Sequence, residues 1–384
     1  MNYALLTSLC LIISGGGEVE TSNLKFKQVK KWQINLPNES WTNIEDSIAI
    51  GNGFVVNSTE FKLEIDTNAD ERPDTDIKGS GGDALLRGKR EDGSKFSYAI
   101  RVRPGGNGWQ YACAGLMSAK VNGVNVSLID QNNNGIWNEV GTDAIIVGKG
   151  NSASYLSEIV NLDGELFTLN ASENGDVVSV TPYEGESGVF SVVDGYNSQG
   201  KLTSAVFTST DSKFSFELSE FKKGMRVPAG EYELTHASVK KGTSEGVTVT
   251  QGLMKAISIE SEQNVKLAWG GPLRIDFETS RASSEIIKRP TNARPITAAI
   301  ARSAKCEGTT VVGTPKFYGS AEEEYQFFPY QRRPNGFLVI SMQNILLTTG
   351  NVINQSPKIT ARGKKSGNKV LSSKLCRGCA VHNW

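Results

Sequence analysis

The sequence contains only two histidines, and neither sign of charge is in excess. Forty-one basic side chains balance forty-one acidic ones among 384 residues. Proteins that bind nucleic acids or anionic membrane surfaces carry an excess of Lys and Arg on one face, so the composition argues against both kinds of partner. Two histidines also leave little material for histidine-based catalysis or for a polyhistidine metal site.

Long apolar runs are missing from most of the chain. Residues 4–13 form an apolar segment that is too short for a membrane-spanning helix, which needs about 18 residues or more. Small residues follow at 14–17, a pattern similar to the core and cleavage region of a secretory signal, although no Lys or Arg precedes it. We therefore expect a signal segment over residues 1–17, a secreted or cell-envelope location and no transmembrane span. A buried strand is the alternative.

Cysteine is sparse, with five residues at positions 10, 113, 306, 376 and 379. In an exported protein we expect a disulfide that joins Cys376 to Cys379, or one of them to Cys306. His382 follows in the tail, so a zinc site is an alternative, but zinc is not the cofactor that we expect. Free thiols or a redox-active pair are the remaining alternatives.

Glycine and short runs of Val, Ile and Phe are abundant instead. Forty glycines and many Ser, Thr and Asn residues indicate frequent turns between short strands, whereas helical periodicity is scarce. Asn122-Gly123 is typical of a tight hairpin turn. The sequence therefore predicts an all-β fold built of several β-sandwich modules.

Three β domains are expected after the signal segment. Residues 18–150 form the first, which contains two acidic loops. Residues 151–270 have the rhythm of a β-meander and form a second sandwich. A boundary is expected near Gly270-Gly271-Pro272, after which residues 271–384 are expected to form an immunoglobulin-like sandwich.

One run in the second domain has a recognisable form. Residues 227–234 read Val-Pro-Ala-Gly-Glu-Tyr-Glu-Leu, which resembles the edge turn of transthyretin-like or carboxypeptidase-regulatory-like β-sandwich modules. Pro228 cannot donate to a strand ladder and so marks an edge, and Gly230 turns the chain. The likeness implies a module of this kind.

The most specific chemical signal is the loop that begins at Asp130. Oxygen-bearing side chains occupy its positions 1, 3 and 5, and Gly135 at position 6 allows a sharp turn. Calcium takes about six to eight oxygen ligands, which this spacing can wrap around one point. A turn without a metal is the alternative, because Asn and Asp favour turns. We expect calcium to be held by Asp130, Asn132, Asn134, the Ile136 carbonyl and Asp143, with Asn138 or Glu139 as a further ligand.

A second acidic loop begins at Asp66 and has oxygens at its positions 1, 3, 5 and 9. Its spacing resembles the calcium loops of dockerin, thrombospondin type 3 and integrin-repeat modules. It departs from them at Glu71, which stands where those loops carry glycine, so the sequence does not guarantee the tight turn. A solvated acidic turn is the alternative. The expected ligands are Asp66, Asn68, Asp70, Asp74 and Asp76.

Together, the leader, the two loops, the turn at 227–234 and the immunoglobulin-like end resemble uncharacterised exported bacterial proteins of the planctomycete type. The resemblance brings no catalytic residues with it. We expect a secreted or cell-surface, calcium-stabilised protein with a structural or binding role, such as adhesion to a protein or carbohydrate ligand.

The alternative is an exported hydrolase whose accessory β modules dominate the sequence. No pair of acidic residues has a context that marks a catalytic centre, so an enzyme is the less expected outcome. Four aromatic residues near position 325 form either a binding face for carbohydrate or peptide or one side of a core strand. They are Tyr325, Phe327, Phe328 and Tyr330.

Overall fold

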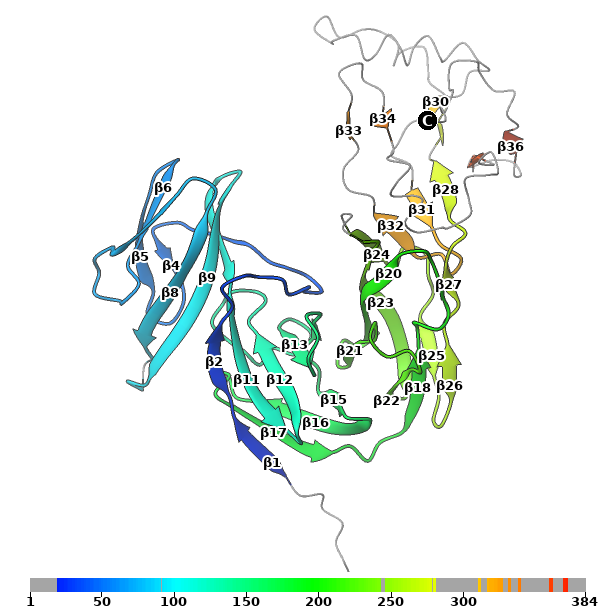
Figure 1. Ribbon diagram of the computed structural model, residues 1–384, viewed down its shortest axis with the longest axis horizontal. Helices are drawn as coiled ribbons and strands as arrows, with labels where there is room; N and C mark the ends of the chain where they lie inside the picture. The colour runs from blue at the N-terminus through cyan, green and yellow to red at the C-terminus, as the bar shows by residue number, and fades with distance from the viewer. Residues whose placement is uncertain are drawn as a thin grey trace, which may run out of the picture.

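The computed structural model describes residues 19–90, 92–242 and 246–277, together with short segments at 279–280, 310–311, 316–326, 331–332, 338–339, 359–361 and 369–371. Throughout these residues the chain is all-β, with several separate sheets and no helix, which confirms the predicted fold class. The sheets follow one another along an open curve, with β5 (Phe54–Ser58) and β9 (Lys95–Gly105) in one arm and β20 (Lys201–Ser209) and β23 (Gly230–Lys240) in the other (Figure 1).

The first arm consists of two antiparallel four-stranded sheets. One contains β4 (Ser47–Ile48), β5 (Phe54–Ser58), β6 (Lys62–Ile65) and β7 (Thr75–Lys78) in that order. The other has the order β3 (Thr42–Asn43), β10 (Gly108–Cys113), β9 (Lys95–Gly105) and β8 (Gly82–Lys89). Alternation decides which residues they bury, since Phe54 and Val56 on β5 and Ala84 and Leu86 on β8 all lie in the core.

The base of the curve consists of two further sheets. The five-stranded sheet has the order β14 (Ser154–Tyr155), β13 (Ala144–Val147), β12 (Val124–Ile129), β11 (Gly115–Val121) and β2 (Lys25–Gln28). The four-stranded sheet has the order β1 (Glu20–Asn23), β17 (Val177–Pro182), β16 (Glu165–Ala171) and β15 (Ile159–Leu162). Asn122 and Gly123 join β11 to β12 with φ angles of 46° and 76°, as the predicted tight hairpin turn requires.

The second arm is dominated by a ten-stranded sheet. Its order is β21 (Ser215–Glu217), β20 (Lys201–Ser209), β23 (Gly230–Lys240), β24 (Val247–Thr250), β32 (Glu324–Gln326), β31 (Lys316–Tyr318), β28 (Arg274–Phe277), β35 (Ile359–Ala361) and β36 (Lys369–Leu371), and β25 (Ile257–Ile259) also pairs with β23. A three-stranded sheet has the order β22 (Met225–Pro228), β18 (Ser187–Ser191) and β26 (Asn264–Lys266). Three two-stranded sheets pair β19 (Tyr196–Asn197) with β27 (Trp269–Gly270), β29 (Thr279–Ser280) with β30 (Thr310–Val311), and β33 (Gln331–Arg332) with β34 (Leu338–Val339).

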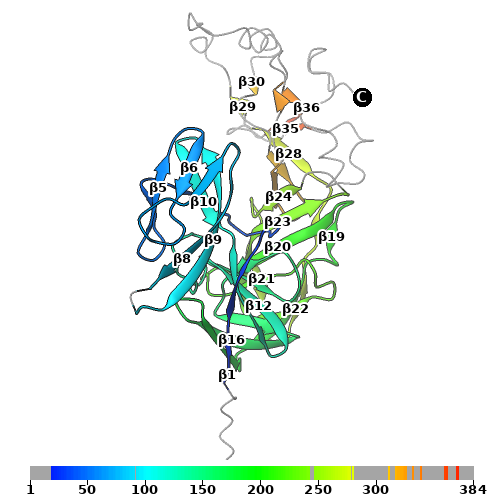
Figure 2. The same cartoon turned by 60° about the vertical axis from the view of Figure 1, so that its left-hand side comes forward.

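Strand pairing crosses both of the internal boundaries that the sequence suggested. Strand β1 pairs with β17 across the boundary at 150/151, and Figures 1 and 2 show it lying along that sheet. Strand β32 pairs with β24 across the boundary at 270/271. Edge strands leave N–H and C=O groups free for any strand that reaches them, so pairing of this kind is set by the whole fold and not by local composition.

The turn at 227–234 lies at a sheet edge, as its proline indicated. Strand β22, which ends at Pro228, is the outer strand of its three-stranded sheet. The hydroxyl of Tyr232 is buried and donates a hydrogen bond of 2.9 Å to the carbonyl of Pro228, which ties the turn to the start of β23.

The described residues form two large apolar cores and a smaller one. The first large core runs from Leu24 to Val180 and the second from Ile159 to Tyr325. Tyr325 is 2% exposed, so the core interpretation is correct for this residue. Phe327, Phe328 and Tyr330 lie outside the described residues.

Candidate metal centre

The loop between β12 and β13 wraps its backbone around the carboxylate of Asp130. This side chain is fully buried. Its Oδ1 accepts hydrogen bonds from the N–H groups of Asn133 (2.6 Å) and Asn134 (3.2 Å), and its Oδ2 accepts from the N–H of Gly135 (2.6 Å) and the hydroxyl of Tyr98 (2.7 Å). Gly135 has a φ of 84°, so the glycine at position 6 supplies the left-handed turn that the sequence pattern called for.

The far end of the loop brings in two more carboxylates. Asp143 is fully buried and accepts hydrogen bonds from the N–H groups of Gln131 (3.3 Å) and Glu139 (3.0 Å). The Oε2 of Glu139 accepts from the side-chain amides of Asn132 (2.7 Å) and Asn134 (2.6 Å). Glu139, which the sequence offered only as a further ligand, is therefore an integral part of this loop.

Negative charge in this loop is poorly solvated. Burial raises the pKa of Asp130 to about 6. Burial also raises the pKa of Asp143 to about 8, with a further contribution from the charges of Asp130 and Glu139. A bound cation would reverse this effect, because it stabilises the ionised form of each carboxylate.

One oxygen of the loop lacks a hydrogen-bond donor. The Oδ1 atom of Asn132 is buried and has no hydrogen-bond partner among the described residues. An unsatisfied buried polar atom costs about 1–3 kcal/mol, whereas an amide oxygen is a normal calcium ligand. In the part of the chain that the structure describes, no cluster of three or more His, Cys, Asp or Glu side chains is arranged to hold a metal, so an ion here needs amide and carbonyl oxygens as well.

The loop between β6 and β7 encloses Asp66 in a similar way. Asp66 is 1% exposed. Its Oδ1 accepts hydrogen bonds from the N–H groups of Asn68 (3.0 Å) and Asp70 (3.4 Å), and its Oδ2 accepts from the N–H of Glu71 (2.8 Å). Glu71 has a φ of 68°, so a glutamate occupies the left-handed position that glycine fills in the other loop.

The two loops share one backbone form although their flanking sequences differ. Position 4 is left-handed in both, with φ angles of 59° at Ala69 and 65° at Asn133. The side chain at position 5 accepts a hydrogen bond from the N–H at position 7 in both, at 3.0 Å from Arg72 to Asp70 and at 2.8 Å from Ile136 to Asn134. These contacts support the equivalence of the two loops more strongly than the residue spacing does.

Asp74 and Asp76, the two remaining expected ligands of the Asp66 loop, have other partners. Asp74 accepts hydrogen bonds from the hydroxyls of Thr67 (2.7 Å) and Thr75 (2.8 Å). Asp76 lies on β7 and forms an ion pair with Lys62 at 3.1 Å. The structure therefore brings Asp66, Asn68 and Asp70 together in one turn, whereas Asp76 lies in a strand with lysine partners.

The two loops belong to separate places in the fold. They connect strands of different sheets, β6 to β7 and β12 to β13. Among the described residues, no hydrogen bond joins one loop to the other. Each loop is thus a candidate site by itself.

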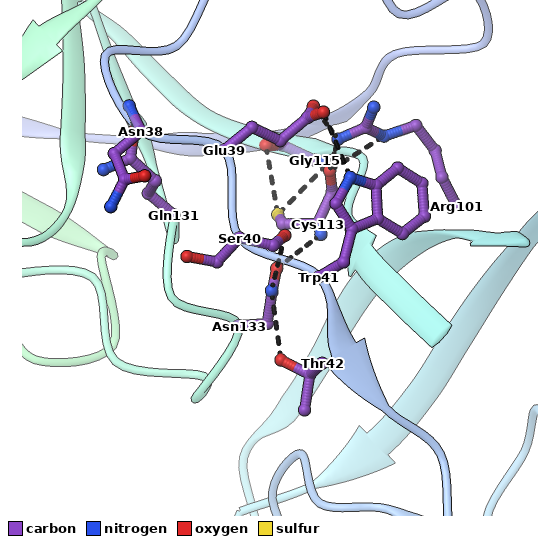
Figure 3. A network of polar contacts seen from close by, with 10 residues as sticks. All are labelled: Asn38, Glu39, Ser40, Trp41, Thr42, Arg101, Cys113, Gly115, Gln131 and Asn133. Carbon is purple, nitrogen blue, oxygen red and sulfur yellow. Dashed lines mark hydrogen bonds and ion pairs between the residues drawn. The ribbon is translucent and has the colours of Figure 1, made fainter. Parts of the chain in front are cut away.

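The Asp130 loop is anchored to the first arm by a residue that the calcium pattern ignores. The side chain of Asn133 accepts a hydrogen bond from the N–H of Cys113 (2.7 Å) and donates to the carbonyl of Ser40 (3.1 Å) and to the hydroxyl of Thr42 (3.2 Å), as Figure 3 shows. The side chain of Gln131 accepts from the N–H of Asn38 at 3.2 Å. The sequence does not reveal this role of Asn133, because its neighbours in the chain do not indicate which strand lies opposite.

Stacked arginine and tryptophan side chains hold the neighbouring segment in place. Arg101 lies 4.1 Å from the ring centroid of Trp32 and 5.1 Å from that of Trp41, and Arg103 lies 3.8 Å from the second ring. Arg101 also pairs with Glu39 at 2.9 Å (Figure 3). Because residues 101 and 103 of β9 lie on the same face of the strand, both guanidinium groups reach the indole of Trp41.

The cysteine predictions concern residues beyond the described segments. Cys306, Cys376 and Cys379 lie outside the described residues, so the disulfide, zinc and thiol alternatives remain predictions. Cys113 is described and is a buried free thiol.

Among the described residues, no helix is long and apolar enough to cross a membrane. Comparison with protein-family models, curated proteins and solved structures finds no match.

Proposed function

We propose that this protein is a secreted or cell-surface β-protein whose inter-strand loops bind calcium, and that its role is structural or ligand-binding. The observation that carries the proposal is the burial of Asp130 and Asp143 in the same loop as the Asn132 oxygen that has no donor. The immunoglobulin-like and transthyretin-like module types belong to the same proposal. The alternative of an exported hydrolase is favoured by no particular arrangement among the described residues.

The chemistry of the donors suits a hard cation that prefers oxygen. Asp130, Asn132, Asn134, the Ile136 carbonyl and Asp143 would hold the ion. Several of these donors are neutral, which is consistent with the affinity of extracellular calcium modules, a Kd of about 10⁻⁴–10⁻³ M. The ion would stabilise the fold because it offsets the mutual repulsion of carboxylates that have lost their water.

Thermal unfolding with and without calcium tests the proposal. Calcium at about tenfold to hundredfold above its Kd stabilises a folded protein by about 1.4–2.7 kcal/mol, so chelation should lower Tm by several degrees. We expect Asn132→Ala to lose most of this calcium response, because it removes the oxygen that has no donor.

The matched control is Asn170→Ala, which changes an exposed residue of β16 and should respond to calcium as the native protein does. An unchanged Tm on chelation of the native protein would remove the calcium proposal.

A further inference from the structure

A groove of about 470 Å³ lies between the end of the Asp130 loop and the inner face of the ten-stranded sheet. Gly141 and Tyr155 line one side, and residues of β20, β23 and the end of β24 line the other. In Figure 1 the strands β13 and β21, which flank this region, lie on the inner side of the curve. The volume is within the range of about 300–1,000 Å³ that is typical of small-molecule sites.

The register of β20 and β23 explains why the floor of the groove is polar. Phe207 pairs with Leu234, and both point into the core. The neighbouring pair, Thr208 and Glu233, points the other way, into the groove. A bulge follows, which leaves Thr235 without a pairing partner and turns its side chain to the groove as well.

Several polar groups of the groove are free to bind a ligand. Among the described residues, no hydrogen bond or ion pair is formed by the side chains of Glu233 and Thr235 or by the hydroxyl of Tyr155. Glu233 and Thr235 are half-buried and line the groove. Polar groups in such a setting provide directional contacts for a ligand that carries hydroxyls.

Charge and apolar surface narrow the class of ligand. The described lining contains one carboxylate, that of Glu233, and no Lys, Arg or His, which disfavours an anionic ligand. Val140 and Leu253 are 42% and 55% exposed and adjoin the lining residues Gly141 and Gly252. A ligand with hydroxyls at its edges and C–H groups on its faces matches this pattern, and a sugar ring has both.

We propose that this groove binds a neutral oligosaccharide. Tyr155 packs against the face of a sugar ring, while Glu233 and Thr235 form hydrogen bonds with its hydroxyls. This inference deepens the proposed binding role. It rests on the calcium proposal only for the edge of the groove that Val140 and Gly141 form. Val140 and Gly141 belong to the loop that calcium would order, so calcium would hold that edge in place.

Isothermal titration calorimetry of the full chain with maltotriose, cellotriose and triacetylchitotriose, in calcium, tests the inference. We expect at least one trisaccharide to bind, and Glu233→Gln and Tyr155→Ala each to weaken its binding by about tenfold or more, because each removes a contact made in the groove.

Glu231→Gln is the matched control. It makes the same chemical change on an exposed residue of β23 that does not line the groove, so it should bind as the native protein does. Thermal melts of all three variants establish that they are folded. Failure of all three sugars to bind, or equal affinity in the Glu233→Gln, Tyr155→Ala and Glu231→Gln variants, overturns the inference.

The two proposals fail in different ways. If chelation changes neither Tm nor the sugar affinity, the calcium proposal fails. The groove assignment then still depends on the sugar affinities of the Glu233→Gln, Tyr155→Ala and Glu231→Gln variants. If calcium raises Tm while no sugar binds, the groove assignment fails alone.

Discussion

At the scale of single residues, the two buried aspartates of the Asp130 loop differ in how many hydrogen-bond donors support their negative charge. Asp130 accepts four hydrogen bonds, three of them from backbone N–H groups of its own loop. Asp143 accepts two, and its pKa is raised further than that of Asp130. Fewer donors at equal burial leave Asp143 less able to carry charge, so Asp143 has more to gain from a cation.

These pKa values predict how the metal-free protein responds to pH. An unfolded aspartate has a pKa of about 3.9, whereas Asp130 and Asp143 have values of about 6 and about 8 in the fold. The fold thus favours the protonated forms, and the stability they contribute is fully present below about pH 4 and is lost as pH rises through the folded values. The urea midpoint of metal-free protein should fall between about pH 5 and about pH 8.

Asp143→Asn should flatten the upper part of this dependence, because the amide does not titrate. Asp163→Asn, at an exposed turn between β15 and β16, should keep the native slope. A midpoint that rises over this range would contradict the assignment.

At the scale of elements, the two acidic loops show that a backbone form can persist without its usual glycine. Asp66 and Asp130 each gather the N–H groups of the following turn, and these contacts enforce the left-handed φ at position 6. Side chains with a Cβ lose about 1–2 kcal/mol in that conformation, so Glu71 carries a strain that Gly135 does not.

Exchanging the residue at position 6 should therefore destabilise the protein in the Asp130 loop but not in the Asp66 loop. Gly135→Ala should destabilise the protein by about 1–2 kcal/mol through backbone strain alone. A Cβ at this site would meet Ile50 at 3.6 Å, which is ordinary contact. Glu71→Gly should leave stability unchanged or raise it by up to about 1 kcal/mol, because relief of strain exceeds the extra entropy of unfolded glycine. Urea unfolding measures both changes.

Gly106→Ala is the control for the glycine substitution. It lies at an exposed turn outside the left-handed region, with no neighbour within 4 Å of an added Cβ. If Gly135→Ala proves as harmless as Gly106→Ala, position 6 is not the constraint that we describe.

At the scale of the whole molecule, the Asp130 loop connects two sheets. Its strands β12 and β13 belong to the five-stranded sheet, and Asn133 reaches across to Cys113 on β10 and to Thr42 on β3. An ordered loop therefore stabilises the contact between the first arm and the base. The same loop contributes Gly141 to the groove on the other side.

Asn133→Ala should weaken this connection. The substitution leaves the N–H of Cys113 without its acceptor in a buried place, so we expect a loss of about 1–3 kcal/mol in urea unfolding. The calcium response of Tm should persist, because Asn133 is not among the expected ligands. Asn125→Ala, at an exposed position of β12, should change stability by no more than about 0.5 kcal/mol. Loss of the calcium response in Asn133→Ala would mean that this residue acts on the ion directly.

Signals confined to a few adjacent residues predicted local structure well. Asn122-Gly123 predicted the hairpin, Pro228 predicted an edge strand, and Gly135 at position 6 predicted a sharp left-handed turn after Asp130. The glutamate at position 71 made a tight turn look less certain, but the same turn forms there without glycine. The roles of Tyr98 and Asn133 could not be predicted, since their partners lie 32 and 20 residues away along the chain.

By itself, the sequence determined the all-β class, the tight turns and the two acidic loops, because steric limits and short-range hydrogen bonds act between residues that are neighbours in the chain. The tertiary structure alone decided that β1 joins β17 and that β32 joins β24, that Asp143 is buried, and that Glu233 faces a groove. Strand pairing and burial depend on which distant segment packs against a given strand. Alternating strands of similar composition can pair in many ways, and only the pairing that buries a common apolar core is stable.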